Sequence, residues 1–127
     1  MSYGISKTVS LSFEQAIEKV TEELKKEGFG VLTTIDMKET LKKKIDVDIP
    51  HYTILGACNP QFAHRALKIE QEIGLFLPCN VLVYEQKGSV TVSAFDPAII
   101  DAVVSNPAIQ ELSEEVQQKL HRVISAL

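Results

Sequence analysis

Two cysteines carry most of the potential chemistry in this sequence, because each lies in a short motif with proline and asparagine. Cys58 belongs to Gly-Ala-Cys-Asn-Pro at residues 56–60, and Cys79 belongs to Leu-Pro-Cys-Asn at residues 77–80. Cys58 directly precedes a predicted helix N-terminus, where backbone N–H groups favour negative charge and lower a thiol pKa. Cys58 is therefore a candidate nucleophile or redox thiol. In the alternative interpretation it is a small buried residue, since free cysteine is among the most buried residue types.

Histidines near these cysteines extend the candidate set to a metal site, with Cys58, His64, Cys79 and His51 as ligands. Cysteine and histidine suit zinc, but their spacing matches no zinc-finger pattern. Seven residues separate His51 from Cys58, so a regular strand directs them to opposite faces unless a bulge intervenes. His64 lies away from the apolar stripe of its predicted helix, as a solvated histidine does. Cys58 with His64 is the first-choice pair, and a metal-free protein is the alternative.

The two cysteines are expected to stay reduced rather than to form an intramolecular disulfide. Cytosolic compartments keep thiols reduced, and a chain of this length buries enough surface to fold without a crosslink. Cys79 shares strand parity with Val81 and Val83, which predicts a thiol in the core. The sequence contains no G-x-G-x-x-G, P-loop, G-x-S-x-G or H-E-x-x-H pattern, so enzymatic activity stays an open question.

Composition limits the classes of protein to which the chain can belong. It has 127 residues, a net charge of −4, 45% hydrophobic and 24% charged residues, which predicts one globular domain over residues 1–127. No apolar run approaches the ~20 residues of a membrane span, and the first residues contain no apolar signal core, which predicts a cytoplasmic protein. The acidic balance argues against nucleic acid as a partner, since dedicated binders are basic.

Apolar periodicity and capping residues predict the elements that must position the two motifs. The expected order is β-α-β-α-β-α-β-β-α-α, an α+β fold with helices on one face of a largely antiparallel sheet. Ser12 and Gln15 form a capping box, and Gly28 ends that helix. Asparagine before proline begins the helix after residue 59 in the same way that Asn106 begins the last helix. The expected strands cover residues 5–11, 29–35, 52–58, 80–86 and 89–95, and the expected helices follow Ser12, Asp36, Asn59, Asp96 and Asn106.

A hairpin around residues 87–88 has a register that the sequence specifies. With these two residues as the loop, Val83 faces Val92 and Val81 faces Ala94, on one apolar face. The other face is mixed and includes Leu82, Tyr84 and Phe95, which is more apolar than a solvated face needs. We therefore expect a homodimer that uses this face, with coverage by a helix of the same chain as the alternative.

The cysteine motifs also resemble those of the prokaryotic family known as "domain of unknown function 302". The matching segments are residues 54–60 (ILGACNP), 63–67 (AHRAL), 72–81 (EIGLFLPCNV) and 96–97 (DP), so the resemblance covers nearly the whole chain. It implies a single α+β domain with an antiparallel sheet similar to the TATA-binding-protein fold, and often a homodimer. It implies no established activity. The family's paired motifs correspond to Cys58-Asn59 and Cys79-Asn80, which are predicted to meet at one rim of the sheet.

Three functional hypotheses follow from this rim. The first is a binding module for a metal or a small anionic or thiol-reactive ligand, with Cys58, Asn59, Cys79 and Asn80 as binding residues. The second is a thiol-dependent enzyme or redox protein with Cys58 as its reactive group. The third is a dimeric interaction domain in which the motifs only shape the core. The first is preferred, because the sequence names no convincing base for Cys58.

Overall fold

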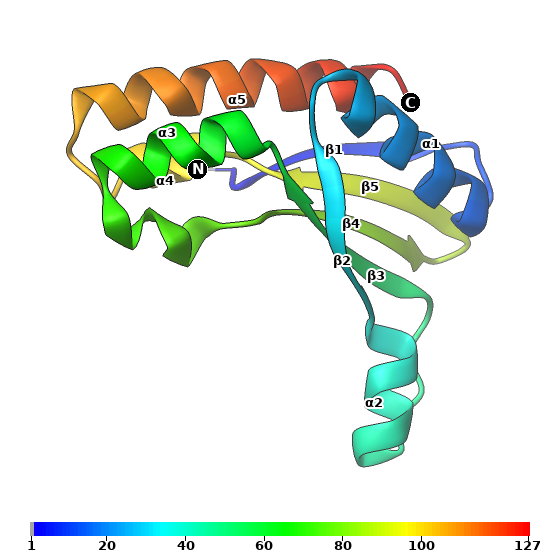
Figure 1. Ribbon diagram of the computed structural model, residues 1–127. Helices are drawn as coiled ribbons and strands as arrows, with labels where there is room; N and C mark the ends of the chain where they lie inside the picture. The colour runs from blue at the N-terminus through cyan, green and yellow to red at the C-terminus, as the bar shows by residue number, and fades with distance from the viewer. Residues whose placement is uncertain (1) are drawn as a thin grey trace.

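The protein is an α+β domain, as its periodicity predicts. The structure is a computed structural model that describes residues 2–127 (Figure 1). The elements in chain order are β1 (Gly4–Val9), α1 (Phe13–Lys26), β2 (Gly30–Asp36), α2 (Met37–Ile45), β3 (Tyr52–Cys58), α3 (Pro60–Ile69), η1 (Gln71–Phe76), β4 (Cys79–Gln86), β5 (Ser89–Phe95), α4 (Ala98–Asp101) and α5 (Pro107–Ser125). No helix in these residues is long and apolar enough to cross a bilayer.

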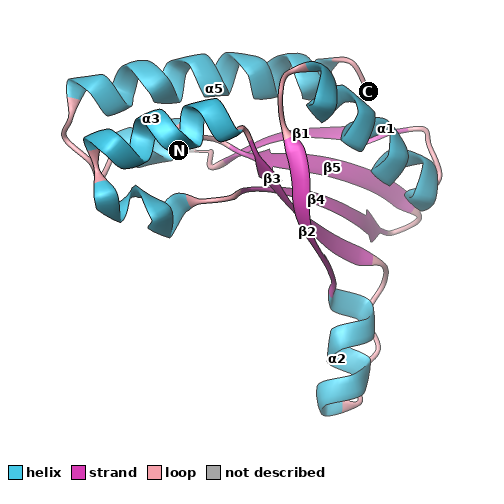
Figure 2. Ribbon diagram, in the orientation of Figure 1, coloured by secondary structure: helices cyan, strands magenta, loops and turns pink. Residues whose placement is uncertain are grey.

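The five strands form one antiparallel sheet in the order β1-β5-β4-β3-β2. The hairpin register agrees with the sequence prediction, because Gln86 pairs with Ser89 and Val83 pairs with Val92. Helices α1, α3 and α5 lie on one face of the sheet (Figure 2). The connection through α1 carries the chain from one edge strand, β1, to the other edge strand, β2.

The main core lies between that helix-covered face and the two long helices α1 and α5. Alternate residues of β4 and β5 point into it, as period-two apolar patterning requires. The helices contribute one stripe each, since residues three and four apart share a helix face. The fully buried side chains of this core include Ala16, Val20, Leu24, Leu55, Val81, Val83, Val92, Leu120 and Val123.

Side-chain caps begin several helices as the sequence predicts, with one exception. Ser12 and Gln15 complete a capping box on α1, and Asn106 accepts a hydrogen bond from the N–H of Ala108 on α5. Gly28 adopts a left-handed conformation with φ of 86°, where glycine has no Cβ to strain. Asn59 occupies the N-cap position of α3, but its side chain makes no capping hydrogen bond. The prediction of an asparagine cap is therefore wrong at this helix.

Two further differences from the sequence prediction concern the segment after α3 and the last residue of β5. The helix after Asn59 ends at Ile69, and a separate 3-10 helix covers residues 71–76 where a break was expected. Phe95 does not contribute to an exposed face. It packs instead against a second apolar cluster centred on Ile73, Ile100 and Ile109. This cluster closes the end of the domain at which the cysteine motifs lie.

Candidate functional site

The two cysteine motifs lie side by side because β3 and β4 are antiparallel neighbours. The last residues of β3 therefore meet the first residues of β4, and Ala57 pairs directly with Cys79. Cys58, one residue further along β3, pairs with Gly30 of β2. The rim that the sequence predicts is thus present as a geometric feature at one end of the sheet.

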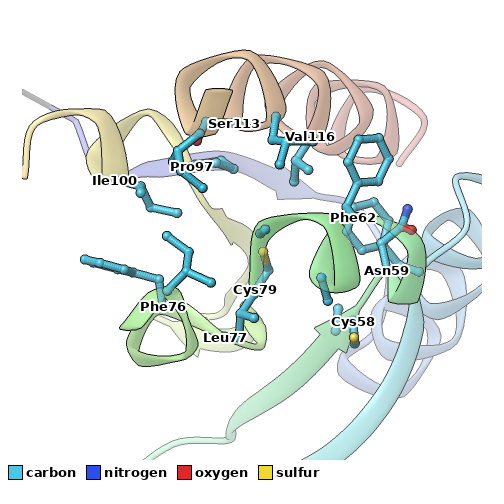
Figure 3. A pocket seen from close by; sticks show the side chains of 17 residues that line it. Cys58, Asn59, Phe62, Phe76, Leu77, Cys79, Pro97, Ile100, Ser113 and Val116 are labelled. Atoms are coloured by element: carbon cyan, nitrogen blue, oxygen red, sulfur yellow. The ribbon is translucent and has the colours of Figure 1, made fainter. Parts of the chain in front are cut away.

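Strand parity places the two sulfurs on different faces of that sheet. Cys79 points to the helix-covered face and is buried, whereas Cys58 is half-buried. Figure 3 shows the Cys58 sulfur directed away from that of Cys79. Both are free thiols. Adjacent strands therefore bring the motifs together without bringing the thiol groups into one cluster.

A cavity lies over this end of the sheet, between α3, α5 and the segment from η1 to α4 (Figure 3). Its free interior is about 60 Å³. The wall comes from segments that are far apart in the sequence, and nearly all of it is apolar. The lining residues are Phe29, Ala57, Cys58, Asn59, Phe62, Ala63, Ala66, Ile73, Phe76, Leu77, Cys79, Pro97, Ile100, Ile109, Leu112, Ser113 and Val116.

The electrostatics of the cavity are those of an uncharged apolar site. Within the part of the chain that the structure describes, no Asp, Glu, Lys, Arg or His lines it. Burial raises the pKa of the Cys79 thiol to about 11, and the neighbouring Cys58 shifts it in the same direction. Cys79 is therefore a neutral thiol at pH 7, and a neutral thiol is neither a good nucleophile nor a metal ligand.

Asn59 has a structural role at the edge of the cavity. Its Nδ2 donates a hydrogen bond to the carbonyl oxygen of Glu27 at 3.2 Å, which ties the start of α3 to the end of α1. The Glu27 carboxylate accepts hydrogen bonds from Arg122 at 2.9 and 3.2 Å and lies 3.7 Å from Lys119, both on α5. Asn80, in contrast, is exposed on the other face of the sheet and does not line the cavity.

The proposed metal ligands do not converge. His51 precedes the opposite end of β3, roughly 23 Å from Cys58 at ~3.3 Å per residue. There its ring stacks on Phe13 at 4.8 Å, and its Nε2 lies 4.0 Å from Glu85. His64 is exposed on α3, outside the cavity. Across residues 2–127 no group of three or more His, Cys, Asp or Glu side chains is placed to hold a metal ion. The structure therefore does not support a metal site made of all four residues. Cys58 and Cys79 lie at one end of the sheet, and His51 lies at the other. His64 is exposed on α3.

The Glu27 contacts predict a pH-dependent contribution to stability. The hydrogen bonds from Arg122 hold the pKa of Glu27 below its usual range. A lowered folded-state pKa stabilises the protein above the unfolded pKa of ~4.3, and this contribution is lost as the pH falls through the folded pKa. We expect Glu27→Gln to unfold more easily at pH 7, by at most about 1 kcal/mol for such a partly exposed pair.

Urea unfolding at pH 7 and pH 3 measures this effect. The difference between wild type and Glu27→Gln should be smaller at pH 3 than at pH 7, because the contribution of the Glu27 charge is lost as the pH falls through its lowered pKa. Glu111→Gln provides the control, since Glu111 is exposed on α5. A difference that is equal at both pH values would contradict the assignment to the Glu27 charge.

Sequence reasoning missed most of the cavity wall. Phe62, Phe76 and Ile100 line it, and each has the ordinary signal of an apolar residue in a helix. Only the lack of charge in Ile73-Gly74-Leu75-Phe76-Leu77 marks one of the contributing segments. The space itself depends on how α3 and α5 pack over the sheet, which no local pattern encodes.

Comparison with known proteins places this arrangement in a family. The family model described as "Domain of unknown function DUF302" matches residues 5–127. The chain belongs to the DUF302 family. This confirms the resemblance carried by the cysteine motifs.

A solved DUF302 structure is similar to this domain in both fold and sequence. It is the crystal structure of an uncharacterized conserved DUF302 protein from Bacillus stearothermophilus, with 30% sequence identity and a TM-score of 0.93. The match covers 99% of this chain and 98% of that one. A comparison with curated proteins finds no match. Membership of the DUF302 family therefore indicates the fold of this chain and no particular chemistry.

Proposed function

We propose that this DUF302 domain is a binding module for a small, uncharged, apolar ligand held in the cavity between α3 and α5. The observation that supports the proposal is the cavity lining, which combines three phenylalanines with aliphatic side chains and has no charged group. Ligand sites are typically concave and mostly apolar, with few polar groups to orient the ligand. Here Cys79 and Ser113 supply those groups.

The size of the cavity limits the ligand to a small molecule. One water molecule needs roughly 10–15 Å³ of such volume, so the free interior of about 60 Å³ corresponds to a few waters. Apolar cavities of modest size stay dry and bind molecules such as benzene. A small ring or a short branched chain therefore fits the proposal, and a cofactor of nucleotide size does not.

The absence of charge in the lining favours a neutral ligand over the anionic one expected from the sequence. Transfer of an ion into an apolar site without a partner is costly. A thiol-reactive ligand is also less favoured, because the raised pKa of Cys79 keeps nearly all of this thiol protonated at pH 7. Cys79 then acts as a soft, weakly polar contact in the floor of the cavity.

A pair of matched probes tests the proposal. NMR titration with benzene and with benzoate compares one ring with and without a charge. We expect benzene to shift signals of Ala63, Ala66 and Cys79, and benzoate to bind at least tenfold more weakly. Ala66→Phe should fill the cavity and abolish the benzene shifts.

Ala108→Phe is the matched control, because Ala108 is exposed on α5 and does not line the cavity. This variant should bind benzene as the wild type does. Equal binding of both probes, or benzene binding that persists in folded Ala66→Phe, would rule out the neutral-ligand proposal.

A further inference from the structure

A buried serine interrupts the apolar stripe of α5 where this helix covers the cavity. Ile109, Leu112 and Val116 lie on that stripe, and Ser113 occupies the position one turn after Ile109. Ser113 is only 6% exposed. Figure 3 shows its side chain among those that line the cavity. Serine is mostly a surface residue, so its burial at this point requires an explanation.

The Ser113 hydroxyl lacks the partner that a buried polar group normally has. In the middle of a helix, a serine or threonine hydroxyl either points to solvent or donates to the carbonyl oxygen four residues earlier. Thr21 on α1 follows this rule, since its Oγ1 donates to the carbonyl oxygen of Ile17 at 2.7 Å. Across residues 2–127, no side-chain hydrogen bond involves the hydroxyl of Ser113.

The free space that this hydroxyl can reach is that of the cavity. Protein atoms do not seal the Ser113 oxygen completely, and the residue lies in the cavity wall. Buried hydroxyls in proteins are usually hydrogen-bonded, either to protein groups or to a molecule beside them. The Ser113 hydroxyl is therefore available to a group inside the cavity.

The other polar side chains of the wall are less suited to this role. Asn59 is half-buried at the edge of the cavity, and its Nδ2 already donates to the carbonyl oxygen of Glu27. The thiols of Cys58 and Cys79 are weak donors and weak acceptors. Only Ser113 combines burial in the wall with a strong hydrogen-bonding atom that has no partner in the described residues.

We propose that Ser113 selects, among small neutral apolar ligands, those that carry one hydrogen-bonding oxygen, such as a phenol or an alcohol. This inference rests on the proposed function and names the ligand class for the same cavity. A serine hydroxyl both donates and accepts hydrogen bonds, so it can pair with a ligand hydroxyl in either direction. A wholly apolar wall would reject that oxygen, because its transfer from water without a partner is costly. Ser113 provides the partner at one place and leaves the rest of the ligand in apolar contact.

Titrations of the full chain with benzene and with phenol, followed by NMR, test the role of Ser113. The two probes share a ring and differ in one neutral hydroxyl. We expect Ser113→Ala to lower the affinity for phenol relative to that for benzene by about tenfold, as the loss of one hydrogen bond predicts. Ser125→Ala makes the same chemical change at an exposed position of α5 and should leave this ratio unchanged.

Urea unfolding without ligand provides an independent measurement. A hydroxyl that serves only a ligand does not stabilise the unliganded fold, and alanine has a higher helix propensity than serine. The urea midpoint of Ser113→Ala should therefore equal or exceed that of the wild type. A lower midpoint would show that the hydroxyl has a partner within the protein, and would overturn the proposal.

The two probes separate this inference from the proposed function. Benzene binding with an unchanged ratio of phenol to benzene affinity in Ser113→Ala would overturn the role of Ser113 and retain the apolar cavity as a binding site. Binding of neither probe by the wild type would exclude both proposals. An equal change of the ratio in Ser125→Ala would show that the effect does not arise in the cavity, and would also overturn the role of Ser113.

Discussion

Replacing Leu120 by alanine is expected to lower the free energy of unfolding by about 2–5 kcal/mol, the range for a fully buried leucine. Leu120 is 0% exposed in the main core, where α5 packs on the sheet. The substitution removes buried apolar surface and leaves a cavity that a close-packed interior fills only partly. Because α5 also forms one wall of the cavity, loss of this packing should loosen that wall.

Urea denaturation measures this effect through the transition midpoint at unchanged slope. Leu67→Ala makes the same chemical change on α3, where Leu67 is 44% exposed. This control should cost well under half as much, since much of the Leu67 surface already contacts water. Equal losses in the two variants would show that Leu120 does not occupy the tightly packed position described above.

Gly56→Ala is expected to destabilise the protein by about 1–3 kcal/mol, the usual cost of overpacking. A Cβ at this position would lie 2.9 Å from Cγ of Pro78, and closer still to Oγ1 of Thr33. Thr33 can rotate only partly out of the way, because β-branched side chains are stiff. The glycine in the first cysteine motif is thus required by the close approach of two neighbouring strands and not by ligand chemistry.

Gly30→Ala is the matched control, since Gly30 lies in β2 and an added Cβ there meets nothing within 4 Å. It should leave the urea midpoint unchanged or slightly higher, because alanine restricts the unfolded chain. The double variant Gly56→Ala/Thr33→Ala should recover part of the loss and leave the Pro78 contact as the remainder. No recovery in the double variant would mean that Thr33 does not limit the space at Gly56.

The positions of the two thiols argue against a single reactive centre formed by both cysteine motifs. Cys79 lies in the floor of an apolar cavity, and burial raises its pKa to about 11. Cys58 lies one residue beyond Ala57, the cross-strand partner of Cys79, and its sulfur points away from that of Cys79. The motifs are therefore best understood as the residues that close the end of the sheet and shape the cavity above it.

Features that depend on residues close together in the chain follow from the sequence alone. Ser12 and Gln15 satisfy the first N–H groups of α1 through contacts three residues apart, and Gly28 adopts the backbone conformation that other residues resist. The pairing of Val83 with Val92 follows from a two-residue turn and strict alternation. Family membership could also be predicted from the sequence, because each cysteine motif is a continuous stretch of the chain.

The packing of segments that are far apart in the chain depends on the tertiary structure. Asn59 is followed by proline like Asn106, yet its amide binds the Glu27 carbonyl because the end of α1 packs beside it. The cavity exists because α3 and α5 leave a gap above Cys79, and the volume of a gap depends on side chains far apart in the chain. Helix α2 projects on the side of the sheet opposite α1, α3 and α5 (Figure 1). Local hydrogen bonds and periodicity specify elements, whereas non-local packing specifies the space between them, and the candidate site of this protein is such a space.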